Sequence, residues 1–452
     1  MADTTVGAGA PYPGQSTPGY RAYVLGALLM VYTFNFIDRV VVGIIQEPIK
    51  TEFSLTDFQL GLLGGPAFAV LYTLLGIPIA RLAERRNRMT IIAICVGVWS
   101  AMTALCGLAT SYATLLVARI GVSVGEAGCT PPAQSVIADY FPLESRATAV
   151  SIYALGVPVG SMLAAIGGGW LAQELGWRAA FLTLGLPGLI LAIIVKLTVK
   201  EPQRAVSAVG SEETPTFAAA LKVLRGKPTF WQVAFGAAIA SFVGYGVGQY
   251  LNSFLIRSHG LTLLQASQLS GAVLGVFAAV GTFTAGWLAD RLIKRHPNAL
   301  AWLPAVGFLL CTPLFIAGYM APSLWIGVPL LMLGSLTQYF YLGCMYASVQ
   351  GVVQPRLRAT ATAVLLFVVN LLGYGLGPPV IGALSDGLAN WSLAQSGLSL
   401  AACAGPAATS AACAAGTSFG LKYAIVIGLL GYLWAAVHFL LAGRTLQKDW
   451  VG

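Results

Sequence analysis

Charged residues are scarce in this 452-residue sequence: Lys, Arg, Asp and Glu make up 9% of it, whereas hydrophobic residues make up 57%. Soluble domains carry about 25% charged residues. A soluble protein could not bury so much apolar surface, because a single hydrophobic core stops growing at about 250–300 residues. The scarcity of charge therefore excludes an ordinary soluble protein and indicates a chain whose apolar surface faces lipid.

Histidines are also few. His259, His296 and His438 are far apart in the sequence, and no spacing typical of a metal site, a phosphate-binding loop or an activated nucleophile is present. We therefore expect no metal, no cofactor and no enzymatic activity, and no soluble segment is long enough for a receptor domain. The net charge of +9 does not predict a nucleic-acid partner, because the positive residues fall in short segments between apolar runs.

Apolar runs of about 20 residues recur twelve times, six on each side of a polar stretch at 200–228. This predicts an all-α membrane protein with a six-helix bundle at 21–199, a cytoplasmic linker at 200–228 and a second six-helix bundle at 229–452. Residues 1–20 lack the basic region of a cleaved signal, so we expect a disordered cytoplasmic tail. The predicted spans are 22–46, 58–80, 89–109, 112–138, 146–172, 177–199, 229–256, 264–289, 299–320, 324–351, 357–384 and 418–442.

Positive charge is divided unequally between the two sides of the predicted membrane. By the positive-inside rule the richer side is cytoplasmic, so we expect a multi-pass protein of the bacterial inner membrane with both termini and the linker in the cytoplasm. The other side, which we call the outer side, carries only Lys50, Arg178, Arg257 and Lys422. The richer side carries Arg81, Arg85, Arg86, Arg88, Arg146, Lys200, Arg204, Lys222, Arg225, Lys227, Arg291, Lys294, Arg295, Arg356 and Arg358.

Two of the seven cysteines, Cys403 and Cys413, fall in an Ala/Gly/Ser-rich outward loop predicted at 386–417. An oxidising compartment would permit a disulfide that ties down this loop, and the sequence leaves open whether it forms. The other five cysteines lie within predicted spans, where they act as small apolar residues.

Two short motifs occur once in each half of the chain. Residues 80–88 read ARLAERRNR and residues 286–294 read GWLADRLIK, while the tetrapeptide Arg-Ala-Thr-Ala begins at both Arg146 and Arg358. The offsets, 294 − 88 = 206 and 358 − 146 = 212, nearly agree. We therefore predict that the two six-helix bundles are pseudo-symmetric.

The first motif resembles the loop signature of the major facilitator superfamily, in which an acid and arginines join neighbouring helices on the cytoplasmic face. An acidic residue at a helix end that pairs with arginine could hold one conformation closed as a latch. Alternatively, the charges only mark the cytoplasmic side. The predicted latch residues are Glu84, Arg85, Asp290, Arg291, Arg146 and Arg358.

Four ionisable residues interrupt the apolar spans of the first half, where such groups are costly and functional by default. Asp38 and Arg39 lie in the first span, and Arg119 and Glu126 lie in the fourth. With a rise of about 1.5 Å per residue in antiparallel helices, Asp38 and Arg119 are expected at similar depth. Arg119 and Glu126 are two turns apart and share one face of their helix.

Two interpretations of these four residues compete. In one, Asp38 and Arg119 form a static buried pair that holds two helices together. In the other, which we favour, Asp38 or Glu126 exchanges a proton while Arg39 and Arg119 alternately hold a carboxylate or an anionic substrate group, so that protonation biases the conformation. Arg39 points about 100° away from Asp38 around the helix, so one pair cannot absorb all four charges.

The second half offers aromatic and amide side chains in its spans instead of charges. Charges on one wall of a cavity and aromatic groups on the other suit an amphiphilic substrate, although aromatic residues in membrane helices also serve as packing or interface anchors. The predicted substrate cavity comprises Asn35, Tyr245, Asn252, Tyr339, Tyr346 and Asn370.

Residues 35–39 (NFIDR) and 119–127 (RIGVSVGEA) resemble the Spinster family of lipid transporters within the major facilitator superfamily. The resemblance implies the major facilitator fold of two pseudo-symmetric six-helix bundles. It also implies proton-coupled alternating access with a sphingosine-phosphate- or lysophospholipid-like lipid as substrate. A proton-coupled organic-anion symporter of the same superfamily is the alternative, and we expect a monomer in either case. By position the resemblance implies protonation sites at Asp38 and Glu126, and head-group or gating roles for Arg39 and Arg119.

Overall fold

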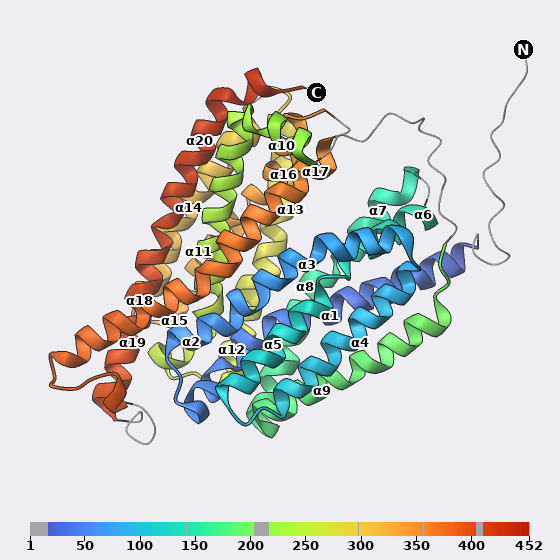
Figure 1. Ribbon diagram of the computed structural model, residues 1–452. Helices are drawn as coiled ribbons and strands as arrows, with labels where there is room; N and C mark the ends of the chain where they lie inside the picture. Colours follow the sequence, from blue (N-terminus) through green and yellow to red (C-terminus); the bar gives the residue numbers. More distant parts are fainter. Residues whose placement is uncertain are drawn as a thin grey trace, which may run out of the picture.

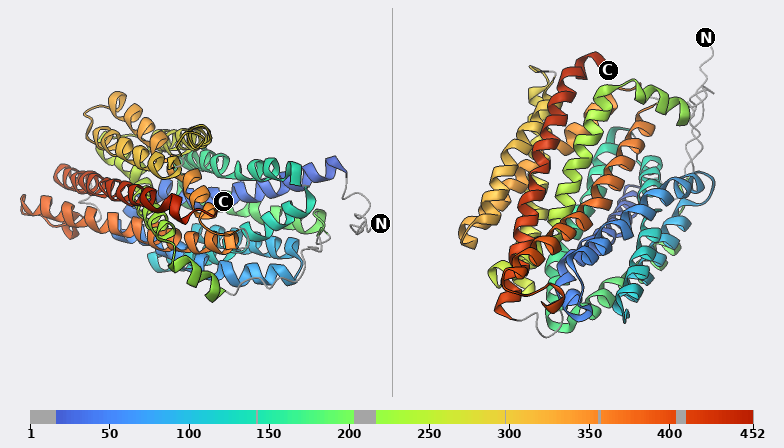
Figure 2. Two further views of the ribbon diagram at one scale, coloured as in Figure 1. Left: turned by 90° about the horizontal axis from the view of Figure 1, so that it is seen from above. Right: turned by 60° about the vertical axis from the view of Figure 1, so that its left-hand side comes forward.

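The structure, a computed structural model, describes residues 17–141, 143–202, 217–296, 298–354, 357–403 and 410–451. All regular elements in these ranges are helices, and they form two bundles that meet at one end and diverge toward the other (Figure 1). The views in Figure 2 separate the same two groups, one coloured blue to green and one coloured green to red.

The first bundle is built from the first half of the chain. Its helices are α1 (Pro18–Phe53), α2 (Asp57–Gly64), α3 (Pro66–Arg85), α4 (Arg88–Gly107), α5 (Tyr112–Glu126), α6 (Thr130–Tyr140), α7 (Leu143–Ala154), α8 (Gly156–Leu163), the π-helix η1 (Ala164–Gly168) and α9 (Gly169–Thr198).

The linker helix and the second bundle follow. Their helices are α10 (Phe217–Arg225), α11 (Pro228–His259), α12 (Leu263–Gly271), the π-helix η2 (Ala272–Phe277), α13 (Ala278–Leu292), α14 (Ala299–Met320), α15 (Leu324–Gln338), α16 (Tyr341–Gly351), α17 (Arg358–Val368), the π-helix η4 (Val369–Tyr374), α18 (Gly375–Ala394), the 3₁₀ turn η5 (Ala401–Cys403), α19 (Ala411–Leu429) and α20 (Gly431–Asp449).

Ten stretches of the described chain are long and apolar enough to cross a membrane. One of them, Thr148–Thr198, has 51 residues, which is about 75 Å of helix against roughly 30 Å of bilayer core. It contains two crossings, because the backbone leaves the helical conformation at Gly176. A further crossing consists of α5 and α6, which is broken after Glu126 and carries Arg119. The helices therefore agree with the predicted twelve crossings.

Large apolar side chains cover the outside of the bundles. Trp325 is 92% exposed, Leu197 78% and Phe283 77%. Exposure of so many apolar groups to water would be energetically unfavourable, whereas lipid tails solvate them. The exposure pattern therefore agrees with a membrane-embedded protein.

Several predicted boundaries differ from the observed ones. The predicted tail overlaps α1, which begins at Pro18, and residues 1–16 lie outside the described chain. At its other end α1 continues to Phe53, so Lys50 lies on a helix and not in a loop. The predicted linker contains helix α10, while residues 203–216 are not described. These differences arise because a helix continues through polar residues once it has left the apolar core of the membrane.

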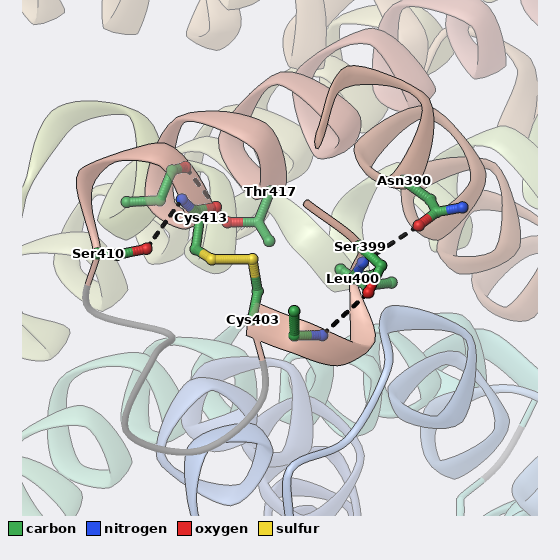
Figure 3. Close-up of a disulfide and its surroundings, with 9 residues drawn as sticks. Asn390, Ser399, Leu400, Cys403, Ser410, Cys413 and Thr417 are labelled. Atoms are coloured by element: carbon green, nitrogen blue, oxygen red, sulfur yellow. Dashed lines mark hydrogen bonds between the residues drawn. A yellow bond between two sulfur atoms is a disulfide. The ribbon is translucent and has the colours of Figure 1, made fainter. Parts of the chain in front are cut away.

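The outward loop is also shorter than the predicted 386–417, because α18 continues to Ala394 and α19 begins at Ala411. Cys403 and Cys413 form a disulfide in this loop (Figure 3). Ser410 accepts a hydrogen bond from the backbone N–H of Cys413 at 3.3 Å and so caps α19. The bridge therefore ties the loop to the first turn of α19.

The predicted repeat is visible in the contacts of two arginines. Arg146 Nη2 donates to the carbonyl of Ala138 at 2.7 Å, and Arg358 Nε donates to the carbonyl of Gln350 at 3.0 Å. The acceptors are separated by 350 − 138 = 212 residues, the same offset as the donors. Each arginine therefore binds the C-terminal end of the preceding helix, where a cation is favoured by the helix dipole.

The turn at Gly176 yields a test of the fold. Its φ of +84° and ψ of 158° are nearly closed to residues with a side chain, whereas an added Cβ would meet no atom within 4 Å. We expect Gly176→Ala to destabilise the protein by about 1–3 kcal/mol through backbone strain alone, measured as a lower unfolding temperature in detergent. Gly387→Ala, in the middle of α18 with equally open surroundings, should be neutral or slightly stabilising. Equal unfolding temperatures for the two variants would contradict the positive φ of residue 176.

Candidate functional site

Arg39 and Glu126 form an ion pair in the first bundle. Arg39 Nε donates to Glu126 Oε2 at 2.7 Å, and this bond joins α1 to α5. The Glu126 side chain is fully buried, whereas that of Arg39 is 19% exposed. The sequence analysis named both residues but did not predict that they pair with each other.

Asp38 and Arg119 lie at the same level of the bundle, as the depth estimate predicts. Arg119 Nη1 donates to the backbone carbonyl of Asp38 at 3.2 Å, and both side chains are almost completely buried. No ion pair forms between the two side chains in this conformation. The static Asp38–Arg119 side-chain pair of the first interpretation is therefore not formed here.

Several charged atoms of this cluster have no hydrogen-bond partner within the described part of the chain. Buried polar atoms are nearly always paired, and leaving one unpaired costs about 1–3 kcal/mol. The unpaired carboxylate oxygens can therefore still accept a proton or a hydrogen bond, and the unpaired guanidinium nitrogens can still donate to water or to a substrate group. They are Asp38 Oδ1, Glu126 Oε1, Arg39 Nη2, and Arg119 Nε and Nη2.

Aromatic rings surround the guanidinium of Arg39. Its Cζ lies 5.2 Å from the ring centre of Phe36, 4.8 Å from that of Phe68 and 4.6 Å from that of Tyr72. Each such cation–π contact stabilises the charged group by about 0.5–2 kcal/mol, depending on exposure. Arg39 is thus held by α1, α3 and α5 together, with one part of its side chain accessible.

The second bundle faces this arginine with tyrosines. Tyr374 of η4 contacts Phe68, with ring centres 5.4 Å apart, and Tyr245 of α11, at 4.4 Å. Because Phe68 also packs against the guanidinium of Arg39, Tyr374 lies close to this cation as well. Tyr245 is 48% exposed in the middle of its helix, so open space remains beside it although Tyr374 and Phe68 join the two bundles at this level.

The predicted cavity residues separate into two groups. Tyr339, at the end of α15, and Tyr346 of α16 are half-buried in the same bundle as Tyr245, and α16 packs against α11, which carries Tyr245. Tyr72 and Tyr374 belong to the same group and were not predicted: Tyr374 lies one turn beyond the predicted Asn370, and the span of Tyr72 was assigned no cavity residue. We call Tyr72, Tyr245, Tyr339, Tyr346 and Tyr374 the tyrosine cluster.

The three predicted amides lie in different surroundings. Asn35 is fully buried beside Glu126. Asn370 is half-buried in η4, which packs against α3 and α11. Asn252 lies away from the tyrosine cluster, because its Nδ2 donates to the carbonyl of Ile44 of the other bundle at 2.9 Å.

Asn252 belongs to a polar seal that joins the outer ends of the bundles. Gln46 Nε2 donates to the carbonyl of Gln249 at 2.9 Å, which mirrors the bond from Asn252 to Ile44. The two donors are separated by 252 − 46 = 206 residues, the offset of the first repeated motif. The seal therefore follows the pseudo-symmetry of the fold, and it was not predicted because only the folded bundles bring these amide side chains next to backbone carbonyls of the other half.

Three of the predicted latch residues whose side chains the structure describes, Arg85, Asp290 and Arg291, form no ion pair with one another in this conformation. Arg85 and Asp290 are exposed, and Arg291 stacks on Trp287 at 3.8 Å. The Glu84 side chain lies outside the described part of the chain. The latch therefore stays a prediction for a conformation in which the cytoplasmic ends approach each other.

A different ion-pair network holds the predicted cytoplasmic end of the first bundle. Arg88 of α4 binds Asp139 of α6 at 2.5 Å and Glu201, just after α9, at 2.6 Å. The network stays within one bundle. In Figure 1 the ends that carry α6 and α7 on one bundle and α10 and α17 on the other diverge, whereas hydrogen bonds of Gln46 and Asn252 join the bundles at the outer end.

The comparisons with known proteins agree with this geometry. The family model of the Major Facilitator Superfamily matches residues 28–378. An MFS-type efflux pump of Mycolicibacterium smegmatis is 34% identical over 364 residues, which cover 80% of this chain and 84% of that protein. Protein spinster homolog 1 of Xenopus tropicalis is 27% identical over 389 residues, which cover 81% of this chain and 74% of that protein.

A solved structure extends the likeness to three dimensions. The crystal structure of a bacterial homologue of the human lysosomal transporter Spinster, in an inward-facing and unoccupied conformation, superposes with a TM-score of 0.89. It is 39% identical, and the match covers 96% of this chain and 99% of that one. The chain therefore belongs to the Major Facilitator Superfamily and is, within it, a homologue of the Spinster proteins: a membrane transporter and not an enzyme.

Proposed function

We propose that this protein is a proton-coupled secondary transporter that moves an anionic amphiphile by alternating access. We place it in the bacterial inner membrane with both termini in the cytoplasm, acting as a monomer. The observation that carries the proposal is the Arg39–Glu126 ion pair in the first bundle, on the side where Tyr245 and Tyr374 of the second bundle lie.

The proton step follows from the contacts of Glu126. One of its oxygens binds Arg39 and the other has no partner among the described residues. A proton on Glu126 cancels the charge that holds Arg39, and the freed guanidinium can then bind an anionic group of the substrate. Asp38, which also has an unpaired oxygen next to Arg119, is the second proposed protonation site. Protonation and substrate binding thus act on the same arginine, which couples them.

The substrate class follows from the two walls of the site. Arg39 offers a partly exposed guanidinium that suits a phosphate or carboxylate head group. The tyrosine cluster and Phe68 offer aromatic surface for an apolar chain. A sphingosine-phosphate- or lysophospholipid-like lipid has both parts. The mycobacterial relative is an MFS-type efflux pump, which supports movement out of the cell.

The proton step predicts how two variants respond to pH. Glu126→Gln keeps the shape of the side chain but resembles its protonated form, and Asp38→Asn does the same at the second site. We expect the wild-type protein to change the distance between spin labels at residues 81 and 295, on exposed parts of the two bundles, when the pH falls. Both variants should lose that response.

The labels can be attached to introduced cysteines, because the five free native cysteines are buried. Glu52→Gln is the matched control, since Glu52 binds Arg178 at 2.5 Å on the surface of the same bundle and should not affect the response. If both test variants follow pH as the wild type does, a different group drives the cycle.

The head-group role of Arg39 predicts a selective loss of affinity. Arg39→Gln should weaken binding of a phosphate-bearing long-chain amphiphile by about 10- to 100-fold, the effect of a hydrogen bond to a charged group. Binding of its uncharged analogue should change little. Arg39→Lys, which keeps the charge without the planar fork, should fall between. Binding can be measured by isothermal titration calorimetry, and equal losses for both ligands would leave Arg39 only a packing role.

Arg119 is expected to behave differently from Arg39. It is 1% exposed and lies behind the backbone of Asp38, so it is placed as a gating residue. Arg119→Gln should slow transport while it preserves the discrimination between charged and uncharged ligands. A selective loss of the phosphate-bearing ligand would instead make Arg119 a direct head-group ligand.

A transport assay separates the lipid transporter from an organic-anion symporter. In proteoliposomes with an imposed pH gradient, we expect movement of the phosphate-bearing amphiphile to follow the gradient and to stop when the gradient is collapsed. Tyr245→Ala should slow it, because the apolar chain loses aromatic surface. Gradient-driven uptake of a small dicarboxylate, without movement of the amphiphile, would favour the symporter.

A further inference from the structure

Arg257, near the outer end of α11, holds two carboxylates of the opposite bundle. Its Nε and Nη2 donate to Glu47, the closest contact being 2.6 Å. Its Nη1 and Nη2 donate to the two oxygens of Asp57, each at 2.8 Å. All three nitrogens of the guanidinium are therefore used in contacts that cross from the second bundle to α1 and α2.

Asp386 makes the second crossing contact, at the N-terminus of α2. The first N–H groups of a helix have no acceptor within the helix. Asp386 Oδ1 accepts a hydrogen bond from the N–H of Asp57 at 2.9 Å, and Asp386 Oδ2 accepts one from the N–H of Phe58 at 2.8 Å. The next N–H, that of Gln59, is capped from within the first bundle by Thr56 at 3.2 Å. The helix thus depends on a residue of the other bundle for two of its N-terminal hydrogen bonds.

Other contacts hold the backbones of α2 and α18 together at this point. Tyr250 donates to the carbonyl of Asp57 at 2.5 Å, and Ser385 donates to Asp57 Oδ2 at 2.6 Å. A Cβ placed on Gly382 would lie 2.4 Å from the same carbonyl. The outer ends of the bundles are therefore in direct backbone contact, which any opening on this side must break.

The two bundles contribute opposite charges at two places in this contact. The first bundle contributes Glu47, Asp57 and Lys50, with Lys50 bound to Asp57, and the positive N-terminus of α2. The second bundle contributes Arg257 and Asp386. A cation faces carboxylates at one point and a carboxylate faces a helix N-terminus at the other. Water can replace these partners when the bundles separate, so the contact can break and re-form in each cycle.

We propose that Asp386 and Arg257 are gating residues that close the outer side of the transporter, Asp386 by capping α2 and Arg257 by clamping Glu47 and Asp57, and that transport requires the release of both. This inference rests only on the alternating-access part of the proposed function. It does not depend on the substrate or on protons.

The backbone N–H groups of Asp57 and Phe58 report directly on this gate. They are protected by Asp386 alone, so their hydrogen exchange measures how often the outer side opens. We would follow exchange by mass spectrometry in overlapping peptides that span 54–62, in the full-length protein without substrate and at constant pH. A peptide from α14 serves as an internal reference.

Arg257→Gln is the decisive variant, because Arg257 donates to the side chain of Asp57 and not to the reporter N–H groups. If the clamp and the cap form one gate, this variant should raise exchange at Asp57 and Phe58 by about tenfold or more, and Arg257→Lys should raise it less. Asp386→Ala should raise it most, and Asp386→Asn, which keeps one acceptor, should fall between.

The matched control is Arg178→Gln. Arg178 lies on the same outer face and binds Glu52 and the carbonyl of Ala109, all within the first bundle. It should leave exchange at the reporter positions unchanged. Unchanged exchange in Arg257→Gln, or transport at the wild-type rate in both Asp386→Ala and Arg257→Gln, would overturn the gate and leave Asp386 a local helix cap. Because exchange is measured without substrate, a failed gate leaves the proposed substrate and proton coupling untouched, and the reverse also holds.

Discussion

The cost of burying charge within a membrane protein governs the arrangement of this molecule. Arg39 and Glu126 can lie there only because each offsets the charge of the other and because aromatic rings surround the guanidinium. Their pairing fixes the register of α1 against α5. It also explains why the facing surface of the second bundle consists of tyrosines, which tolerate a nearby cation and also contact apolar groups. A fully satisfied network would be rigid, whereas this one retains unpaired oxygens on Asp38 and Glu126.

Helix α1 connects this buried cluster to the outer seal. Arg39 and Glu47 lie eight residues apart on the same helix, which corresponds to about 12 Å along its axis. Gln46 and Lys50 extend the same helix into the seal. Under the proposed cycle, a shift of α1 that follows the release of Arg39 from Glu126 would also move the groups that bind the second bundle. Helix α1 therefore carries residues of both polar clusters, and it can link the central site to the proposed outer gate.

The sequence predicted the features that follow from composition and left out those that depend on packing. Twelve crossings, two halves and the common level of Asp38 and Arg119 all follow from hydropathy, repeats and helix rise. The direction of the Arg39 side chain does not follow from these patterns, because it is set by Phe68 and Tyr72 on another helix. The outer seal was missed for a related reason. An apolar window ends where Lys50 and Arg257 begin, whereas the helices continue and these side chains find partners that only the folded bundles bring near.

The two halves of the chain make equivalent hydrogen bonds at several positions but differ in the residues of the central site. Gln46 and Asn252, and likewise Arg146 and Arg358, occupy equivalent positions and make equivalent bonds, as exchange between two related conformations requires. The central charges have no such counterpart: Arg39 and Glu126 face Tyr245 and Tyr374. A substrate with the same chemical groups on both sides would gain no binding free energy from this difference between the two walls. A molecule with a charged head and an apolar chain gains on both walls at once, and only its head meets the residues proposed to carry the proton. The asymmetry of the site is thus the physical reason why we propose an amphiphile, and not a uniformly polar solute, as the substrate.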